Sequence, residues 1–249
     1  MPELLGLPYS PWSEKARWAL EARGIAYDRK LYQPLLGELG LRRKLGKWRG
    51  IVSVPVLTDD DGRVIPDSAD IARWADGRGA GPEMFPAGRD AEVERFIALS
   101  ERGMAAGRAL SLLRLLDDDE GIGEMVPRTL RSVPGARALA KVGIARTLRK
   151  YRGMRDQEAA RAALAEVLDE VRAALANAPA DPVKTLLGRF TFADVAVAQV
   201  LAFVEPPAFG LRLGEATRRS FCDDVLRARF ADLVAWRDAL YEAHRPRHA

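Results

Sequence analysis

Residues 9–20 read YSPWSEKARWAL and contain the clearest helix start in the chain. Ser10 is suited to cap this helix, because its side-chain oxygen can accept a hydrogen bond from a free backbone N–H, while Pro11 takes the first helical position at no hydrogen-bond cost. The apolar residues 3–7 just before it predict a buried strand. We therefore expect Ser10 at a strand-to-helix turn on one edge of a sheet, where open sheets bind ligands.

The first 80 residues alternate between strand and helix patterns, in the order β-α-β-(α)-β-β-α. The sequence predicts a strand at 3–7, a helix at 11–23 closed by Gly24, a strand at 25–32, a basic segment at 41–50, a hairpin with strands at 54–57 and 63–65, and a helix capped by Ser68. This alternation predicts an α/β domain that ends near residue 78.

Residues 78–90 concentrate glycine and proline and interrupt every period, so we place a linker at 79–90. Beyond it, apolar residues recur at helical spacing in four segments, 89–117, 156–178, 191–204 and 220–243. The sequence therefore predicts two domains, an α/β domain at 1–78 and an all-helical domain at 91–249.

The composition excludes several classes of protein. The 249 residues are 48% hydrophobic and 30% charged with a net charge of +4, and include one cysteine and two histidines. An internal disulfide, a zinc site and a histidine-dependent triad are therefore not expected, and neither is any other metal site. Because there is no long apolar run and no signal-peptide pattern, we expect a soluble cytoplasmic protein.

Four motifs together resemble the soluble glutathione transferase superfamily. Residues 10–13, SPWS, resemble its catalytic serine or cysteine motif, and Val54-Pro55 resembles its Val-cis-Pro. Asp67-Ser68 resembles the acidic-Ser pair, and residues 191–194, TFAD, resemble the capping box of the helical domain. Each motif alone is weak, but their order and spacing fit the family across most of the chain.

The resemblance implies a thioredoxin-like N-terminal domain that binds glutathione and an all-α C-terminal domain that contributes a pocket for an electrophile. It implies a serine-type glutathione transferase of the kind that acts in detoxification, with glutathione as co-substrate, a small hydrophobic electrophile as second substrate, and a homodimer as the assembly. No metal and no nucleic acid are implied.

Ser10 is the candidate catalytic residue. An unperturbed thiol has a pKa of roughly 8.5, so little thiolate is present at neutral pH. The free N–H groups and the positive end of the dipole of a helix that begins at Pro11 favour a negative sulfur beside Ser10, and the serine hydroxyl can donate one more hydrogen bond. Ser10 would then stabilise the thiolate of glutathione and attack nothing itself. The alternative interpretation is that Ser10 is only a helix cap.

The resemblance assigns the rest of the glutathione site to four residues. A cis Val54-Pro55 bond would present the backbone of Val54 to the cysteinyl backbone of glutathione. Ser68 would bind the γ-glutamyl carboxylate and Asp67 the ammonium group, although the family more often has glutamate in the position of Asp67. A cation for the glycyl carboxylate would come from the basic segment, with Arg42, Arg43, Lys44 and Lys47 as candidates.

The aromatic residues fall into two groups. Tyr9 and Trp12 flank Ser10 and are candidates for lining the electrophile pocket. Trp18 and Trp74, at helical spacing, are expected in the core. Thr191 and Asp194 satisfy the capping-box pattern, so we expect a role in folding, with Phe190 and Phe192 buried beside them.

Residues 125–155 contain nine arginines and lysines and no acidic residue. We expect the solvated face of a long helix there. Contact with an anionic membrane surface and guidance of acidic substrates toward the cleft are the less favoured alternatives. Aromatic residues are almost absent from this stretch, which argues against binding of single-stranded nucleic acid.

Other functions remain open at this point. A thiol-disulfide reductase is disfavoured because serine occupies positions 10 and 13, where redox members would have cysteine. Isomerase, dehalogenase and peroxidase activities could use the same thiolate. A non-catalytic protein that keeps the fold for binding a ligand or a partner is the alternative from a different class, since fold does not determine function.

Overall fold

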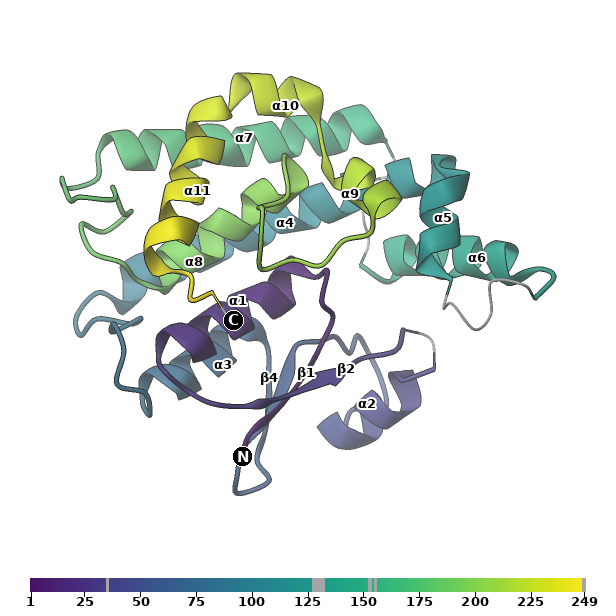
Figure 1. The fold of residues 1–249 in the computed structure, drawn as a ribbon, viewed down its shortest axis with the longest axis horizontal. Helices are drawn as coiled ribbons and strands as arrows, with labels where there is room; N and C mark the ends of the chain where they lie inside the picture. Colours follow the sequence, from purple (N-terminus) through teal and green to yellow (C-terminus); the bar gives the residue numbers. More distant parts are fainter. Residues whose placement is uncertain (35, 127–132, 152–153, 155, 248–249) are drawn as a thin grey trace.

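The computed structural model describes residues 1–34, 36–126, 133–151, 154 and 156–247. A four-stranded sheet with the order β2-β1-β3-β4 forms one part, and a layer of helices forms the other (Figure 1). The strands are β1 (Glu3–Gly6), β2 (Asp28–Leu31), β3 (Val56–Thr58) and β4 (Val64–Pro66). β1 pairs in parallel with β2 and antiparallel with β3, and β3 pairs antiparallel with β4.

Three helices accompany the sheet: α1 (Pro11–Ala22), α2 (Glu38–Leu45) and α3 (Ser68–Asp76). Residues 77–89 contain no helix or strand. The remaining helical elements are α4 (Asp90–Asp117), α5 (Asp119–Met125), α6 (Ala136–Lys150), α7 (Gln157–Ala176), α8 (Phe192–Ala198), the 3₁₀ helix η2 (Gln199–Phe203), α9 (Glu215–Phe221), α10 (Asp224–Arg229) and α11 (Ala231–His244). The architecture is thus an α/β thioredoxin-like part followed by a mostly helical part, as the sequence predicts.

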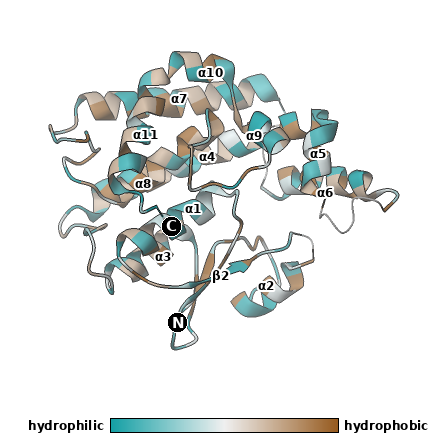
Figure 2. Ribbon diagram, in the orientation of Figure 1, coloured by the Kyte–Doolittle hydropathy of each residue, from teal (hydrophilic) through white to brown (hydrophobic). Residues whose placement is uncertain are grey.

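Helix α1 joins the two parts. It packs against α3 on the sheet side and against α8 and η2 on the helical side, while α4 packs against α7, α8 and η2 (Figure 1). The largest apolar cluster accordingly runs from Trp18 of α1 through α4, α7 and α8 to α11. In contrast, β2 lies at the edge of the sheet with all four residues exposed, and Figure 2 shows its hydrophilic colour. The start of α1 is therefore held between two packed layers.

Several expectations about individual residues are confirmed. Trp18 is fully buried and Trp74 nearly so, and Phe190 and Phe192 lie in the core. The buried Asp194 carboxylate accepts hydrogen bonds from the backbone N–H of Thr191 at 2.8 Å and of Leu186 at 2.7 Å. This capping box fixes the start of α8 against the loop before it.

One expectation about helix limits is wrong. Residues 220–243 do not form one helical segment, because Cys222 and Asp223 adopt extended backbone between α9 and α10. The buried Asp223 carboxylate caps α10 through the N–H of Leu226, at 2.9 Å, and also binds Arg114 and Arg161 from two other helices. These tertiary contacts break the helix although the intrinsic helix propensity of the segment favours its continuation. A sequence pattern shows the propensity but not the contacts.

The basic stretch is only partly described, since Arg128, Arg131, Arg152 and Arg155 lie outside the described residues. Within it, α6 spans fifteen residues, of which only Ile144 is buried. Ile144 packs with Leu115 and Ile122, and this contact holds α6 against the ends of α4 and α5. Among the helices of the described ranges, none is long and apolar enough to cross a membrane.

Candidate functional site

Sheet register brings three of the predicted site segments to one edge. Val56 of β3 pairs antiparallel with Leu5 of β1 and with Pro66 of β4. Moving back two residues from Val56 to Val54 therefore runs alongside the chain that leaves β1 toward Ser10, and alongside the chain that leaves β4 toward Ser68. The strand order thus gathers residues from positions 10, 54 and 68 although they are far apart in sequence.

Ser10 is the N-cap residue of α1. Its backbone is extended, with φ −89° and ψ 123°, and its Oγ accepts the N–H of Ser13 at 3.4 Å. No group in the described part of the chain accepts a hydrogen bond from the Ser10 hydroxyl. The hydroxyl proton can therefore be donated to an anion at the helix N-terminus, where the helix dipole also favours negative charge.

Ser13, the other serine of the motif, is structural. It is fully buried, and its Oγ accepts the backbone N–H of Leu7 at 3.0 Å. The same oxygen would lie 3.0 Å from a Cβ built on Gly6, so the first turn of α1 sits directly on the end of β1. Ser13 thereby fixes the distance between the sheet and the helix start that carries Ser10.

The peptide bond between Val54 and Pro55 is cis. Val54 lies two residues before the start of β3 and is partly exposed. Among the described residues, none forms a backbone hydrogen bond with the N–H or the C=O of Val54. Both groups are thus available to pair with an extended backbone, in the manner of a strand added to a sheet edge.

The turn before α3 corrects one prediction about Asp67 and Ser68. We predicted Ser68 as the cap of α3, but Asp67 is the N-cap, with Oδ1 accepting the N–H of Ala69 at 2.8 Å. Asp67 has a positive φ of 73°, an unusual backbone conformation for a non-glycine residue. This turn leaves Ser68 as the first helical residue, 2% exposed, and its hydroxyl has no hydrogen-bond partner in the described ranges.

A buried lysine lies behind this pair and was missed by the sequence analysis. Lys15 of α1 is 1% exposed, and its Nζ contacts Ser100 Oγ and Glu101 Oε1 of α4, both at 2.8 Å. Glu101 Oε2 accepts the indole N–H of Trp12 at 2.7 Å. One carboxylate therefore ties two residues of α1 to the helical part, and a contact across 86 residues leaves no local sequence signal.

The charges around Asp67 determine its titration. Burial raises the pKa of Asp67, the hydrogen bond from Ala69 opposes this effect, and the nearby Glu101 carboxylate adds to it. Burial likewise lowers the pKa of Lys15, which Glu101 and Asp67 oppose. Two carboxylates and one ammonium group thus lie within electrostatic reach of one another beside the N-terminus of α3.

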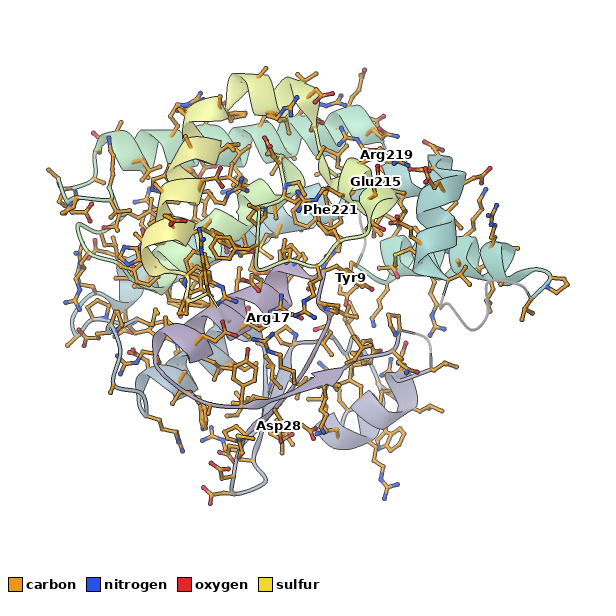
Figure 3. All side chains as sticks on the ribbon, in the orientation of Figure 1. Tyr9, Arg17, Asp28, Glu215, Arg219 and Phe221 are labelled. Carbon is orange, nitrogen blue, oxygen red and sulfur yellow. The ribbon has the colours of Figure 1, made fainter. Side chains whose placement is uncertain are left out.

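Tyr9 and Trp12 both lie near the start of α1, where Figure 3 labels Tyr9 between the sheet and the helical layer. Burial raises the pKa of Tyr9 to about 12, with a smaller effect from Tyr32. The ring of Trp12 meets Phe203 edge-on at a centroid distance of 6.4 Å. Trp12 is therefore a contact between α1 and the helical part, and only part of its surface is free to meet a ligand.

The four candidate cations for a glycyl carboxylate lie in different places. Lys44 binds Glu3 at 3.2 Å and Thr58 at 2.8 Å, at the end of the sheet away from Ser10. Arg43 and Lys47 are exposed. Arg42 reaches the carbonyl oxygen of Gly50 at 3.1 Å, on the loop that leads to Val54.

Arg42 also lines a basic cavity between α2 and α6. The cavity has a volume of about 480 Å³ and is lined by Glu38, Arg42, Gly50, Ile51, Val142, Arg146, Arg149 and Lys150. Glu38 pairs with Arg42 at 2.7 Å and with Arg146 at 3.3 Å. The hydrogen bond from Arg42 lowers the pKa of Glu38, as do the charges of Lys150 and Arg146, so this side of the site is strongly positive.

A buried ion cluster holds the loop that enters Ser10. Arg17, labelled in Figure 3, donates hydrogen bonds to the carbonyl oxygens of Leu7 at 3.1 Å and Pro8 at 3.3 Å. Glu14 is fully buried and pairs with Arg17 and with Arg245 of the C-terminal tail, both at 2.7 Å. Arg245, which follows α11, therefore stabilises the turn that carries Ser10 through Glu14 and Arg17.

The sequence of the N-terminal part matches a known protein family. Residues 9–78 match the family model for the glutathione S-transferase N-terminal domain. A search of curated proteins finds no significant match. Within the described residues, no cluster of three or more histidine, cysteine or acidic residues could hold a metal ion.

Solved structures extend the likeness to the whole chain. The glutathione transferase GSTFuA3 from Phanerochaete chrysosporium is 17% identical, with 100% of this chain and 98% of that chain covered and a TM-score of 0.65. A glutathione S-transferase from Methylobacillus flagellatus with glutathione bound is 18% identical, with 98% and 95% covered and a TM-score of 0.58. A glutathione S-transferase from Ceriporiopsis subvermispora in complex with glutathione is also 18% identical, with 98% and 94% covered and a TM-score of 0.59.

These findings define the class of protein. Residues 9–78 match the glutathione S-transferase N-terminal domain family, and the full chain has the fold of solved glutathione transferases. The fold that the resemblance implies is confirmed.

Proposed function

We propose that this protein is a serine-type glutathione transferase. Glutathione binds along the edge of the sheet, with its cysteinyl backbone on Val54 and its γ-glutamyl end at Asp67 and Ser68. Its sulfur lies beside Ser10, whose hydroxyl donates a hydrogen bond to the thiolate. Arg42 binds the glycyl carboxylate. The thiolate then attacks a hydrophobic electrophile held between the start of α1 and the helical part.

One observation carries this proposal. Ser10 lies at the N-terminus of α1, at the sheet edge beside Val54, and among the described residues neither the Ser10 hydroxyl proton nor the N–H and C=O of Val54 have a hydrogen-bond partner. A thiolate at this position gains a hydrogen bond and a favourable helix dipole, whereas the neutral thiol gains little from either. The pKa of the bound thiol falls, so more nucleophile is present at neutral pH. The solved structures with bound glutathione support the choice of ligand.

The γ-glutamyl contact is tested by Ser68→Ala. Because Ser68 is buried and its hydroxyl has no partner among the described residues, its removal takes away a ligand contact without breaking an internal bond. We expect calorimetric titration to show about 10-fold weaker glutathione binding, the loss expected for one hydrogen bond to a charged group. Ser111→Ala is a matched control, since Ser111 is also buried but bonds only the carbonyl of Arg108 in its own helix. Equal affinities for Ser68→Ala and wild type would remove Ser68 from the site.

We further propose that the protein acts as a homodimer in the cytoplasm, with an α/β domain at 1–78, a linker at 79–90 and a helical domain at 91–249. Closed two-fold dimers are the commonest assemblies of soluble proteins. Light scattering coupled to size-exclusion chromatography should give twice the mass of one chain. A mass of one chain at micromolar concentration would contradict the dimer.

A further inference from the structure

Arg108 of α4 lies between two aromatic rings beside the proposed site. Its guanidinium carbon is 4.6 Å from the centroid of the Trp12 ring and 3.9 Å from that of Tyr151. Trp12 is two residues after Ser10, and Tyr151 follows the last residue of α6. A guanidinium that lies over aromatic rings and forms no hydrogen bond keeps its N–H groups for a ligand, and these groups can bind a carboxylate in bidentate geometry.

Arg108 differs from two buried arginines of this chain, whose charges are neutralised by partners. Arg245 is paired with two carboxylates, and Arg237 binds Asp238 and two backbone carbonyls. In contrast, no described residue forms an ion pair or a hydrogen bond with the guanidinium of Arg108. The nearest carboxylate in electrostatic terms, Glu101, has both oxygens engaged by Lys15 and Trp12.

The surroundings of Arg108 add to its positive field. Lys150 interacts electrostatically with Arg108, Arg42 and Arg146, and Glu38 is the carboxylate that faces this group of cations. Burial lowers the pKa of the Arg108 guanidinium, which means that its charge is held at a cost in free energy. An anion bound here would stabilise the charged guanidinium, because its hydrogen bonds would take the place of the hydration that burial has removed.

We propose that the second substrate is an acidic electrophile, with a carboxylate or comparable anionic group on its apolar part, and that Arg108 binds that group. This inference rests on the proposed function, since it concerns the substrate that the glutathione thiolate attacks. Arg108 is on the helical side of the first turn of α1, so it would hold the far end of an electrophile whose reactive carbon faces Ser10. The apolar part of the substrate would lie against the exposed part of the Trp12 ring.

The test uses two glutathione conjugates that differ by one charge. S-(2,6-dinitrophenyl)glutathione carries no charge on its aromatic ring, and S-(4-carboxy-2,6-dinitrophenyl)glutathione carries a carboxylate on the same ring. Calorimetric titration of wild type should show about 10-fold tighter binding of the carboxylated conjugate, the gain expected for one desolvated charge-assisted pair. Arg108→Met should abolish this preference while the affinity for glutathione stays within about twofold of wild type.

Two further variants keep the test interpretable. Arg102→Met is the matched control, because Arg102 is on the same helix and pairs with Glu170 on the exposed surface, so it should retain the preference. Arg108→Lys keeps the charge without the planar fork and should retain part of the preference. It also separates loss of charge from loss of packing.

Equal affinity of wild type for the two conjugates, or a preference that persists in Arg108→Met, would overturn the inference while leaving the transferase proposal intact. A loss of glutathione affinity in Arg108→Met as large as the loss for the conjugate would also overturn it, because Arg108 would then contact glutathione itself. Absence of binding of glutathione and of both conjugates to wild type would overturn the transferase proposal and the inference together.

Discussion

Ser10→Ala should lower kcat/KM for conjugation of glutathione by about 10- to 100-fold, because a hydrogen bond to a charged group is worth about 1.5–3 kcal/mol. The pKa of the bound glutathione thiol should rise by about 1–2 units for the same reason. The loss should be largest below the wild-type thiol pKa and shrink as pH rises, because high pH supplies thiolate without help from the protein. Steady-state rates between pH 5.5 and 9 measure this profile.

The capping role of Ser10 needs a separate control. Loss of the cap alone costs about 1 kcal/mol of the free energy of unfolding, so Ser10→Ala should fold but melt earlier. Ser10→Thr keeps both the cap and the hydroxyl donor and should restore most of the activity. If Ser10→Ala matched wild type in rate and in pH profile, Ser10 would be only a helix cap, and a non-catalytic binding protein would become the better interpretation.

Glu14→Gln should lower the free energy of unfolding by about 3–5 kcal/mol, a large share of the usual 5–15 kcal/mol. Glu14 is fully buried and holds two buried arginines, Arg17 and Arg245, so its neutralisation leaves Arg17 without its carboxylate partner. Urea unfolding followed by circular dichroism measures the loss. Glutathione affinity should fall as well, because Arg17 fixes the carbonyl oxygens of the loop that leads to Ser10.

An exposed pair supplies the comparison. Glu92 binds Arg89 at 2.6 Å with the same i,i+3 spacing that relates Glu14 and Arg17, but both partners reach solvent. Glu92→Gln should therefore cost less than about 1 kcal/mol. Similar losses for Glu14→Gln and Glu92→Gln would show that the buried cluster contributes no more than a surface ion pair.

The parts of the site that sequence could predict are those that depend on local chemistry. Ser10 followed by Pro11 is a local helix-start signal that does not depend on the fold, and Ser10 is the N-cap of α1 in the structure. The Thr191 to Asp194 capping box is predictable for the same reason. The sequence indicates Asp67 and Ser68 as a pair at the start of a helix, but not which of them caps it. That depends on the positive φ of Asp67, which a sequence pattern does not reveal.

The remaining residues were missed because their partners are distant in the chain. Lys15 and Glu101 are 86 residues apart, and Glu14 and Arg245 are 231 apart, so none of these charges has a local pattern that marks it as buried. Arg108 occurs in a helical stretch with no local motif, and only the contacts of α4 with α1 and α6 bring it beside Trp12 and Tyr151. The break at Asp223 likewise follows from its contacts with α4 and α7.

The most direct test of the central claim is the titration of the glutathione thiol bound to the wild-type protein, followed by thiolate absorbance in the ultraviolet as pH rises. We expect the bound thiol to have a pKa at least about one unit below the roughly 8.5 of an unperturbed thiol, since both the Ser10 hydroxyl and the α1 dipole favour the anion. A bound thiol that titrates like free glutathione would contradict the assignment of Ser10 as the group that stabilises the thiolate. Failure to bind glutathione would contradict the function itself.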